Sequence, residues 1–144
     1  MAEAILKDLL RQDGKEKLYQ VRSAGTWTRD GLSGSPLALQ AMKELGLDIS
    51  THRSRQLTSQ DIEGASLIIV MTQDQKEALG VEFPQAREKL FLLSEMAENR
   101  YDIDDPSGSN SLTLHRTRAQ EIKGLLERGY SCILELAARD AGET

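Results

Sequence analysis

A chain of 144 residues, of which 39% are hydrophobic, 28% charged and 4% aromatic, suits one compact domain, residues 1–144, with a modest core. The net charge of −5 argues against nucleic-acid partners, and no apolar run reaches the roughly 18 residues of a membrane span. The start also lacks the basic and apolar segments of a secretion signal, so we expect a cytoplasmic protein. A single cysteine, Cys132, excludes an internal disulfide, and with only two histidines it argues against a metal site.

The first third of the chain predicts a helix, a strand and a second helix. Met1–Gln12 carries its apolar residues on one face at helical spacing. Leu18–Ser23 is predicted as a strand. Ser35 and Pro36 have the residue types of an N-cap and a first helical position, and Gly46 is suited to end the helix that they open.

The remainder of the chain alternates strands with helices. Ser66–Met71 and Lys89–Leu93 are apolar runs typical of strands buried in a parallel sheet. A short helix, a helix over Gln73–Leu79 and a long helix over Leu112–Arg139 are predicted from caps and periodicity. The two capping boxes pair Thr58 with Asp61 and Thr72 with Gln75. This order of elements predicts a layered α/β domain.

The predicted element order is unusual for that class at its start. A doubly wound sheet normally opens with a strand, whereas this pattern opens with a helix that has no capping residue before Met1. We therefore expect that a first strand is missing.

Five segments, taken together and in this order, resemble the low-molecular-weight protein tyrosine phosphatase family, and are most similar to its bacterial members, some of which act on phosphoarginine. They are MAEAIL at the start, SAGTW at 23–27, THRSRQLT at 51–58, SLIIVMT at 66–72 and DIDDPSG at 102–108. The resemblance implies a three-layer, flavodoxin-like fold, in which a parallel sheet has helices on both faces. It also implies hydrolysis of a phosphorylated protein or a small aryl phosphate through a cysteinyl-phosphate, without a cofactor.

The segment that the family uses for its chemistry is not found among these residues. In the family, a strand and a CxxxxxRSP loop precede MAEA, and this loop supplies the nucleophile, the phosphate cradle and the clamping arginine. We therefore expect an N-terminally truncated domain that lacks its first central strand. Cys132 is predicted to lie within the last helix without a glycine-rich turn, so it does not replace the nucleophile. The chain as given is expected to be inactive.

The resemblance assigns roles to four residues that are present. Asp105 matches the general acid, although an aspartate before proline is also typical of a solvated turn. Trp27 either walls the substrate mouth or covers the core. Ser23 and His52 match residues that support the phosphate loop, against the alternatives of strand-end pairing and a surface histidine. His115 is predicted to lie on the surface.

Several alternatives remain beside a phosphatase. A non-catalytic, phosphatase-like binding protein is the main one, and an unrelated flavodoxin-like binding domain is another. Thiol-dependent arsenate reduction is rejected because it needs more than one cysteine. The segment at 31–35 is not the GxSxG of a serine hydrolase. The choice between phosphotyrosine and phosphoarginine is left open.

Overall fold

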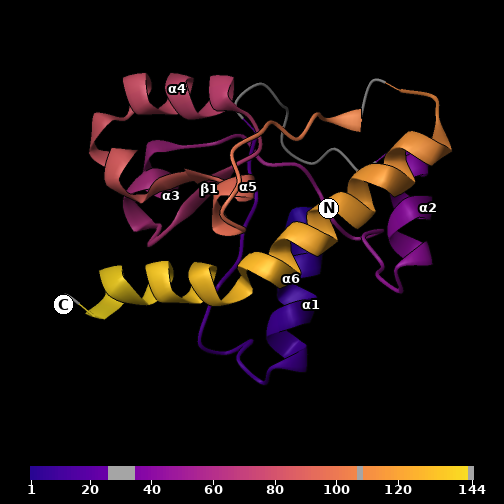
Figure 1. The fold of residues 1–144 in the computed structure, drawn as a ribbon, viewed down its shortest axis with the longest axis horizontal. Helices are drawn as coiled ribbons and strands as arrows, with labels where there is room; N and C mark the ends of the chain where they lie inside the picture. Colours follow the sequence, from indigo (N-terminus) through magenta and orange to yellow (C-terminus); the bar gives the residue numbers. More distant parts are fainter. Residues whose placement is uncertain (26–34, 107–108, 143–144) are drawn as a thin grey trace. The chain divides into compact units, whose positions relative to one another are not determined.

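The computed structural model describes residues 1–25, 35–106 and 109–142, which divide into two compact units (Figure 1). The first unit comprises residues 1–57 and 105–123, and the second comprises residues 58–104 together with the chain from 124 onward. The last helix, α6 (Leu112–Gly142), begins in the first unit and ends in the second.

The first unit contains α1 (Ala2–Gln12), α2 (Pro36–Glu44) and the start of α6. Both α1 and α2 were predicted with nearly these bounds. Helix α1 buries Ile5 and Leu10, as its amphipathic pattern requires. The Ser35 side chain accepts a hydrogen bond from the Ala38 N–H at 3.2 Å, with Pro36 at the first helical position.

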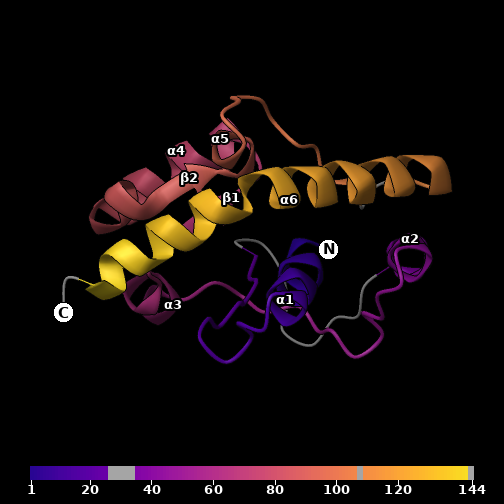
Figure 2. The ribbon, with the colours of Figure 1, turned by 60° about the horizontal axis from the view of Figure 1, so that its bottom comes forward.

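Helix α2 is joined to the start of α6 by an exposed ion pair. The guanidinium of Arg116 donates two hydrogen bonds to the carboxylate of Glu44, each 2.6 Å long. Figures 1 and 2 both show α2 beside the first turns of α6. This pair has the bidentate geometry that distinguishes arginine from lysine as a partner for carboxylates.

The second unit is built around one parallel strand pair, β1 (Ile68–Val70) and β2 (Leu90–Leu92). Ile68 pairs with Leu90 and Val70 with Leu92. The connection between the strands runs through α4 (Gln73–Glu82) and a 3-10 helix, η1 (Pro84–Lys89), as a parallel pair requires (Figure 2). The predicted α/β class with a parallel sheet is therefore confirmed, although both strands are shorter than the apolar runs that predicted them.

The two predicted capping boxes both form, and each opens a helix of the second unit. Thr58 accepts from the Asp61 N–H at 3.2 Å before α3 (Ser59–Gly64), and the Asp61 carboxylate accepts from the Thr58 N–H at 2.9 Å. Thr72 and Gln75 make the equivalent bonds, at 3.2 and 3.3 Å, before α4. Because these bonds join residues three apart, the sequence alone is sufficient to predict them.

Helix α5 (Leu93–Met96) follows β2 directly and packs against α6. Leu93 and Leu125 are fully buried. The backbone of Gly129 lies so close to α5 that a Cβ placed there would be 2.6 Å from the Met96 Cβ. The absence of a side chain at position 129 therefore allows this packing.

The prediction of a strand at Leu18–Ser23 is wrong for the described chain. Leu18 ends a turn, where its N–H donates to the Lys15 carbonyl at 3.0 Å, and no described segment forms a ladder with the residues that follow. The nearest sheet-like pairing is a single parallel bridge between Gly25 and Gln56. A strand is defined by its partner, and residue types alone do not supply one.

The prediction that His115 lies on the surface is also wrong. The side chain is 1% exposed, and its Nδ1 lies 2.9 Å from the Ser111 carbonyl oxygen, one turn earlier. Its Nε2 is buried without a hydrogen-bond partner. His115 continues the buried stripe of α6, being four residues before Ala119 and seven before Ile122.

Glu95 makes a partly buried ion pair in the second unit. Its Oε1 lies 2.8 Å from Lys76 Nζ and also accepts from the Leu92 N–H at 3.3 Å. Burial opposes the charged form, but the bonds from Lys76 and Leu92, with nearby positive charge, lower the pKa of Glu95 below its ordinary value of 4.5.

Glu95→Gln is therefore expected to lower the free energy of unfolding by about 1–3 kcal/mol at pH 7. A carboxylate whose pKa is lowered on folding contributes stability above its unfolded pKa and loses it as pH falls through the folded value. The difference between wild type and variant should thus be constant near neutrality and shrink below pH 4.5. Urea unfolding across this range measures it. A difference that grew on acidification would contradict the prediction.

Candidate active site at the start of helix α1

Three of the four predicted site residues lie in the first unit, near the N-terminal end of α1. Ser23 precedes the bridge at Gly25, His52 lies on the segment that the bridge holds, and Asp105 begins the return of the chain to this unit. The fourth residue, Trp27, lies outside the described residues.

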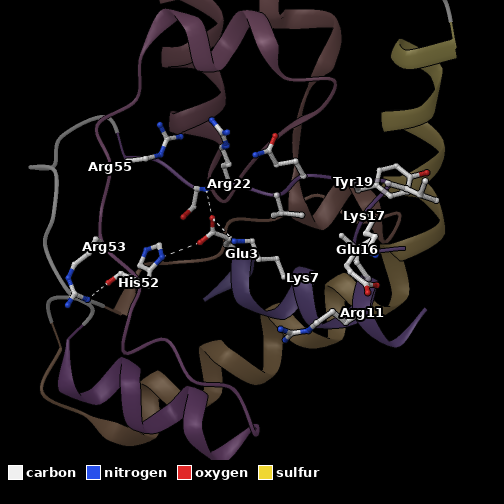
Figure 3. Close-up of a pocket in the computed structure, with 15 residues that line it drawn as sticks. Glu3, Lys7, Arg11, Glu16, Lys17, Tyr19, Arg22, His52, Arg53 and Arg55 are labelled. Carbon is white, nitrogen blue, oxygen red and sulfur yellow. Dashed lines mark hydrogen bonds and ion pairs between the residues drawn. The ribbon is translucent and has the colours of Figure 1, made fainter. Parts of the chain in front are cut away.

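Glu3, in the first turn of α1, connects two of these residues (Figure 3). Its Oε1 accepts a hydrogen bond from the Ser23 N–H at 3.1 Å, and its Oε2 lies 3.1 Å from His52 Nδ1. Lys7, one turn along the helix, is 3.6 Å from the same carboxylate. Glu3 therefore fixes the loop at Ser23 and the segment at His52 to the start of α1.

Backbone pairing holds the same two segments together beyond Ser23. The Gly25 N–H donates to the Arg55 carbonyl, and the Leu57 N–H donates to the Gly25 carbonyl, each at 2.8 Å. Arg53 adds hydrogen bonds from its guanidinium to the Ser50 and His52 carbonyls, at 2.9 and 2.8 Å. Hydrogen bonds to backbone groups before and after His52 therefore set its position.

Asp105 is exposed and acts electrostatically on the start of α1. Burial lowers the pKa of the Met1 amine, and the negative charges of Glu3 and Asp105 oppose that effect. Two carboxylates thus act on the amine of Met1, at the N-cap position of α1.

The approach to Asp105 is anchored in the second unit, at the end of β1. The Ile103 N–H donates to the Met71 carbonyl at 2.9 Å, and the side chain of Ile103 is 2% exposed. Asp102 Oδ1 accepts from the Gln73 N–H at 2.8 Å, at the N-terminus of α4. These bonds hold the chain before Asp105 at the end of β1 and the start of α4.

The N-terminus of α1 has no side-chain cap, because Met1 occupies the N-cap position. First-turn N–H groups without a cap, together with the positive end of the helix dipole, favour an anion. Asp105 acts at the same helix end, so a helix end that favours an anion lies near a carboxyl group, a type of group that can transfer a proton.

Cys132 and metal ligands play no part in this arrangement. Cys132 is half-buried in the interior of α6, within the second unit. Over the described ranges no group of three His, Cys, Asp or Glu side chains could hold a metal ion. Among the helices of those ranges, none is long and apolar enough to cross a membrane.

Sequence reasoning did not single out Glu3. A glutamate in the first helical turn is ordinarily explained by the helix dipole alone. Its partner Ser23 is 20 residues away in the chain, and neither periodicity nor a local motif links the two. Only the pairing of segments in three dimensions identifies Glu3.

The described chain is an α/β protein with a parallel strand pair, and comparison with known proteins shows its family. The sequence profile of the family described as low molecular weight phosphotyrosine protein phosphatase matches residues 1–133. The chain therefore belongs to the low-molecular-weight protein tyrosine phosphatase family.

The proteins similar to this chain include phosphatases that are named for different substrates, and a reductase. A probable low molecular weight protein-tyrosine-phosphatase, EpsP, of Ralstonia solanacearum is 37% identical over 74% of this chain and 68% of its own length. A protein-arginine-phosphatase of Bacillus subtilis is 30% identical over 89% of this chain and 83% of its own. An arsenate reductase of Staphylococcus aureus is 31% identical over 88% of this chain and 82% of its own.

Solved structures agree with this membership. A low molecular weight protein tyrosine phosphatase from T. tengcongensis superposes with a TM-score of 0.81 at 31% identity, covering 88% of this chain and 85% of that one. The YwlE arginine phosphatase, in a form with a phosphorylated active-site serine, gives a TM-score of 0.84 at 29% identity, over 93% and 86% of the two chains.

Proposed function

We propose that this chain is the scaffold of a phosphomonoesterase that removes phosphate from phosphotyrosine or phosphoarginine in proteins through a cysteinyl-phosphate. The observation that carries the proposal is the gathering of Ser23, His52 and Asp105 around the uncapped start of α1. The phosphate dianion would bind at this helix end, where N–H groups and the dipole favour it.

Asp105 is the proposed general acid. It would protonate the leaving oxygen or nitrogen as the phosphorus bond breaks, and would then take a proton from the water that hydrolyses the phosphoenzyme. Ser23 and His52 are proposed to support the phosphate-binding loop, with Glu3 fixing them to α1. Trp27 is proposed to wall the substrate mouth. No cofactor is needed for these steps.

The nucleophile is not among residues 1–144. The reaction needs a thiolate that attacks phosphorus, and the sole cysteine of this sequence is half-buried inside α6. The presence of only one cysteine in this sequence also argues against arsenate reduction, which depends on a second thiol. A cytoplasmic location suits the proposal, since thiolate chemistry requires a compartment that keeps thiols reduced.

The 144-residue polypeptide is expected to show no hydrolysis of p-nitrophenyl phosphate or of a phosphoarginine peptide above the uncatalysed rate. Asp105→Asn should change nothing further in this polypeptide, because a general acid has no effect without a nucleophile. Release of p-nitrophenol and of phosphate measures both. Turnover that Asp105→Asn abolishes would overturn the assignment of the nucleophile.

The codons before Met1 provide the complementary experiment and separate the enzyme from its main alternative, a non-catalytic phosphatase-like binding protein. If they encode a strand and CxxxxxRSP in frame, the longer polypeptide should hydrolyse aryl phosphates. Asp105→Asn should then lower its kcat by roughly 10²–10⁴-fold for a poor leaving group. If the upstream reading frame does not encode that segment, the result would favour the non-catalytic, phosphatase-like binding protein.

A further inference from the structure

Three successive residues between α5 and α6 are held by hydrogen bonds within the second unit, just before the proposed general acid (Figure 1). They are Tyr101, Asp102 and Ile103. Asp105 is the second residue after Ile103, and two residues of extended chain span at most about 7 Å. Whatever fixes Ile103 therefore limits where the Asp105 carboxyl group can lie.

Tyr101 is held by Ser94, a fully buried residue of α5. The Ser94 hydroxyl accepts a hydrogen bond from the Tyr101 N–H at 3.1 Å and donates one to the Tyr101 carbonyl at 2.8 Å. The Ser94 carbonyl also accepts from the Asn99 N–H at 2.9 Å, which closes the turn that follows α5. One buried hydroxyl thus serves as donor and acceptor for the residue at which the loop to Asp105 begins.

The exposed side chain of Asp102 bonds to the start of α4. Its Oδ1 accepts from the N–H of Gln73, the first residue of that helix, at 2.8 Å. The first N–H groups of a helix have no acceptor within the helix, so a carboxylate from another segment can serve one of them. A charged acceptor at this end is also favoured by the helix dipole.

The junction of β1 and α4 that receives Asp102 is held by bonds of its own. Gln75 Oε1 accepts from the Met71 N–H at 3.0 Å and from the Thr72 N–H at 3.3 Å. The Met71 carbonyl accepts from the Ile103 N–H at 2.9 Å, and the Ile103 side chain is buried. Asp102 therefore joins the loop to a fixed support at the carboxyl end of β1, the edge at which α/β sheets bind their ligands.

We propose that Asp102 is a positioning residue for the general acid: its bond to the Gln73 N–H holds the loop so that the Asp105 carboxyl group can protonate the leaving group. This role rests on the proposed function, because it belongs to the same reaction. Asp102 acts through the backbone of residues 103–105 and not by contact with the substrate. The two aspartates, three residues apart, thus have different tasks.

Amide exchange in the 144-residue chain tests the tether without catalysis. Asp102→Ala is expected to lower the protection factors of the Gln73 and Ile103 N–H groups by about 2- to 13-fold, the equivalent of one net hydrogen bond. Both groups exchange when the loop detaches locally. The N–H of Leu125, in the interior of α6, should keep its protection, because Asp102 is exposed and its truncation leaves the core intact.

Two further variants make the exchange test specific. Asp102→Asn keeps an oxygen that can accept from the Gln73 N–H, so its protection factors should stay close to those of wild type. Asp74→Ala removes an exposed carboxylate from the first turn of the same helix and leaves the Asp102 bond in place. Asp74→Ala should therefore leave the protection of Ile103 unchanged. Both substituted positions are exposed, so circular dichroism should show the same fold throughout.

The dependence on the leaving group tests the role in the reaction, in the longer polypeptide that carries CxxxxxRSP. There, Asp102→Ala should lower kcat/KM for phenyl phosphate, whose leaving oxygen needs a proton, by about tenfold or more. For dinitrophenyl phosphate, whose leaving group needs no proton, the change should stay below about twofold. Asp102→Asn should restore most of the loss. A merely structural defect would lower kcat/KM for both substrates alike.

Asp105→Asn, measured beside these variants, separates this role from the function on which it rests. If Asp105→Asn impairs only the phenyl phosphate reaction and Asp102→Ala impairs neither substrate or both equally, Asp102 is not a positioning residue although the phosphatase assignment stands. If Asp105→Asn shows no dependence on the leaving group, or if the upstream frame lacks CxxxxxRSP, the proposed function fails and this role with it. Unchanged protection of Ile103 in Asp102→Ala would overturn the tether in every case.

Discussion

Gly129→Ala is expected to lower the free energy of unfolding by about 1–3 kcal/mol, the usual cost of overpacking. The added Cβ would lie 2.6 Å from the Met96 Cβ and 2.9 Å from the Met96 carbonyl carbon and oxygen. Two of these three atoms belong to the backbone, so no rotamer change relieves the contact. The gain of about 1 kcal/mol from replacing a helical glycine with alanine is too small to offset it.

Gly124→Ala is the matched control, because it makes the same change in the same helix. Its nearest neighbour would be the Arg128 guanidinium at 3.9 Å, an ordinary contact at the end of a flexible side chain. Here the helix propensity term should prevail, and stability should rise by up to about 1 kcal/mol. Urea unfolding of the two variants beside wild type gives the comparison. Equal stabilisation by both substitutions would show that α5 and α6 are not in close contact at Met96.

His115→Ala is expected to cost about 2–4 kcal/mol, comparable with other large side chains removed from a core. The imidazole is 1% exposed, and its loss leaves a cavity near the start of α6. The hydrogen bond from Nδ1 to the Ser111 carbonyl is also lost, although that oxygen still accepts from the His115 N–H at 3.3 Å. Thermal or urea unfolding measures the effect.

Two companion variants make the His115 result specific. His115→Leu should recover most of the loss, because it refills the volume and removes the unpaired Nε2 from the core. Gln120→Ala, at an exposed position of the same helix, should stay within about ±0.5 kcal/mol of wild type. A surface histidine, as the sequence predicted, would instead make all three variants nearly equal to wild type.

The candidate site was only partly predictable from the sequence. Asp105, Ser23 and His52 were singled out by resemblance, and the structure places all three in one unit near the start of α1. Their catalytic and supporting roles stay predictions. Glu3, which connects Ser23 with His52, was not found, because its contacts join positions that no local pattern relates.

The sequence by itself determined the features that depend on neighbours three or four residues apart. The capping boxes at Thr58 and Thr72, the Ser35–Pro36 helix start and the amphipathic faces of α1 and α6 all appear where they were predicted. The tertiary structure decided what depends on distant partners. Leu18–Ser23 has residue types that suit a strand but no described neighbour to form a ladder, and ladder hydrogen bonds need two segments. His115 lies in the core because it falls on the buried stripe of α6, four residues before Ala119, and only packing shows which polar side chains that stripe includes.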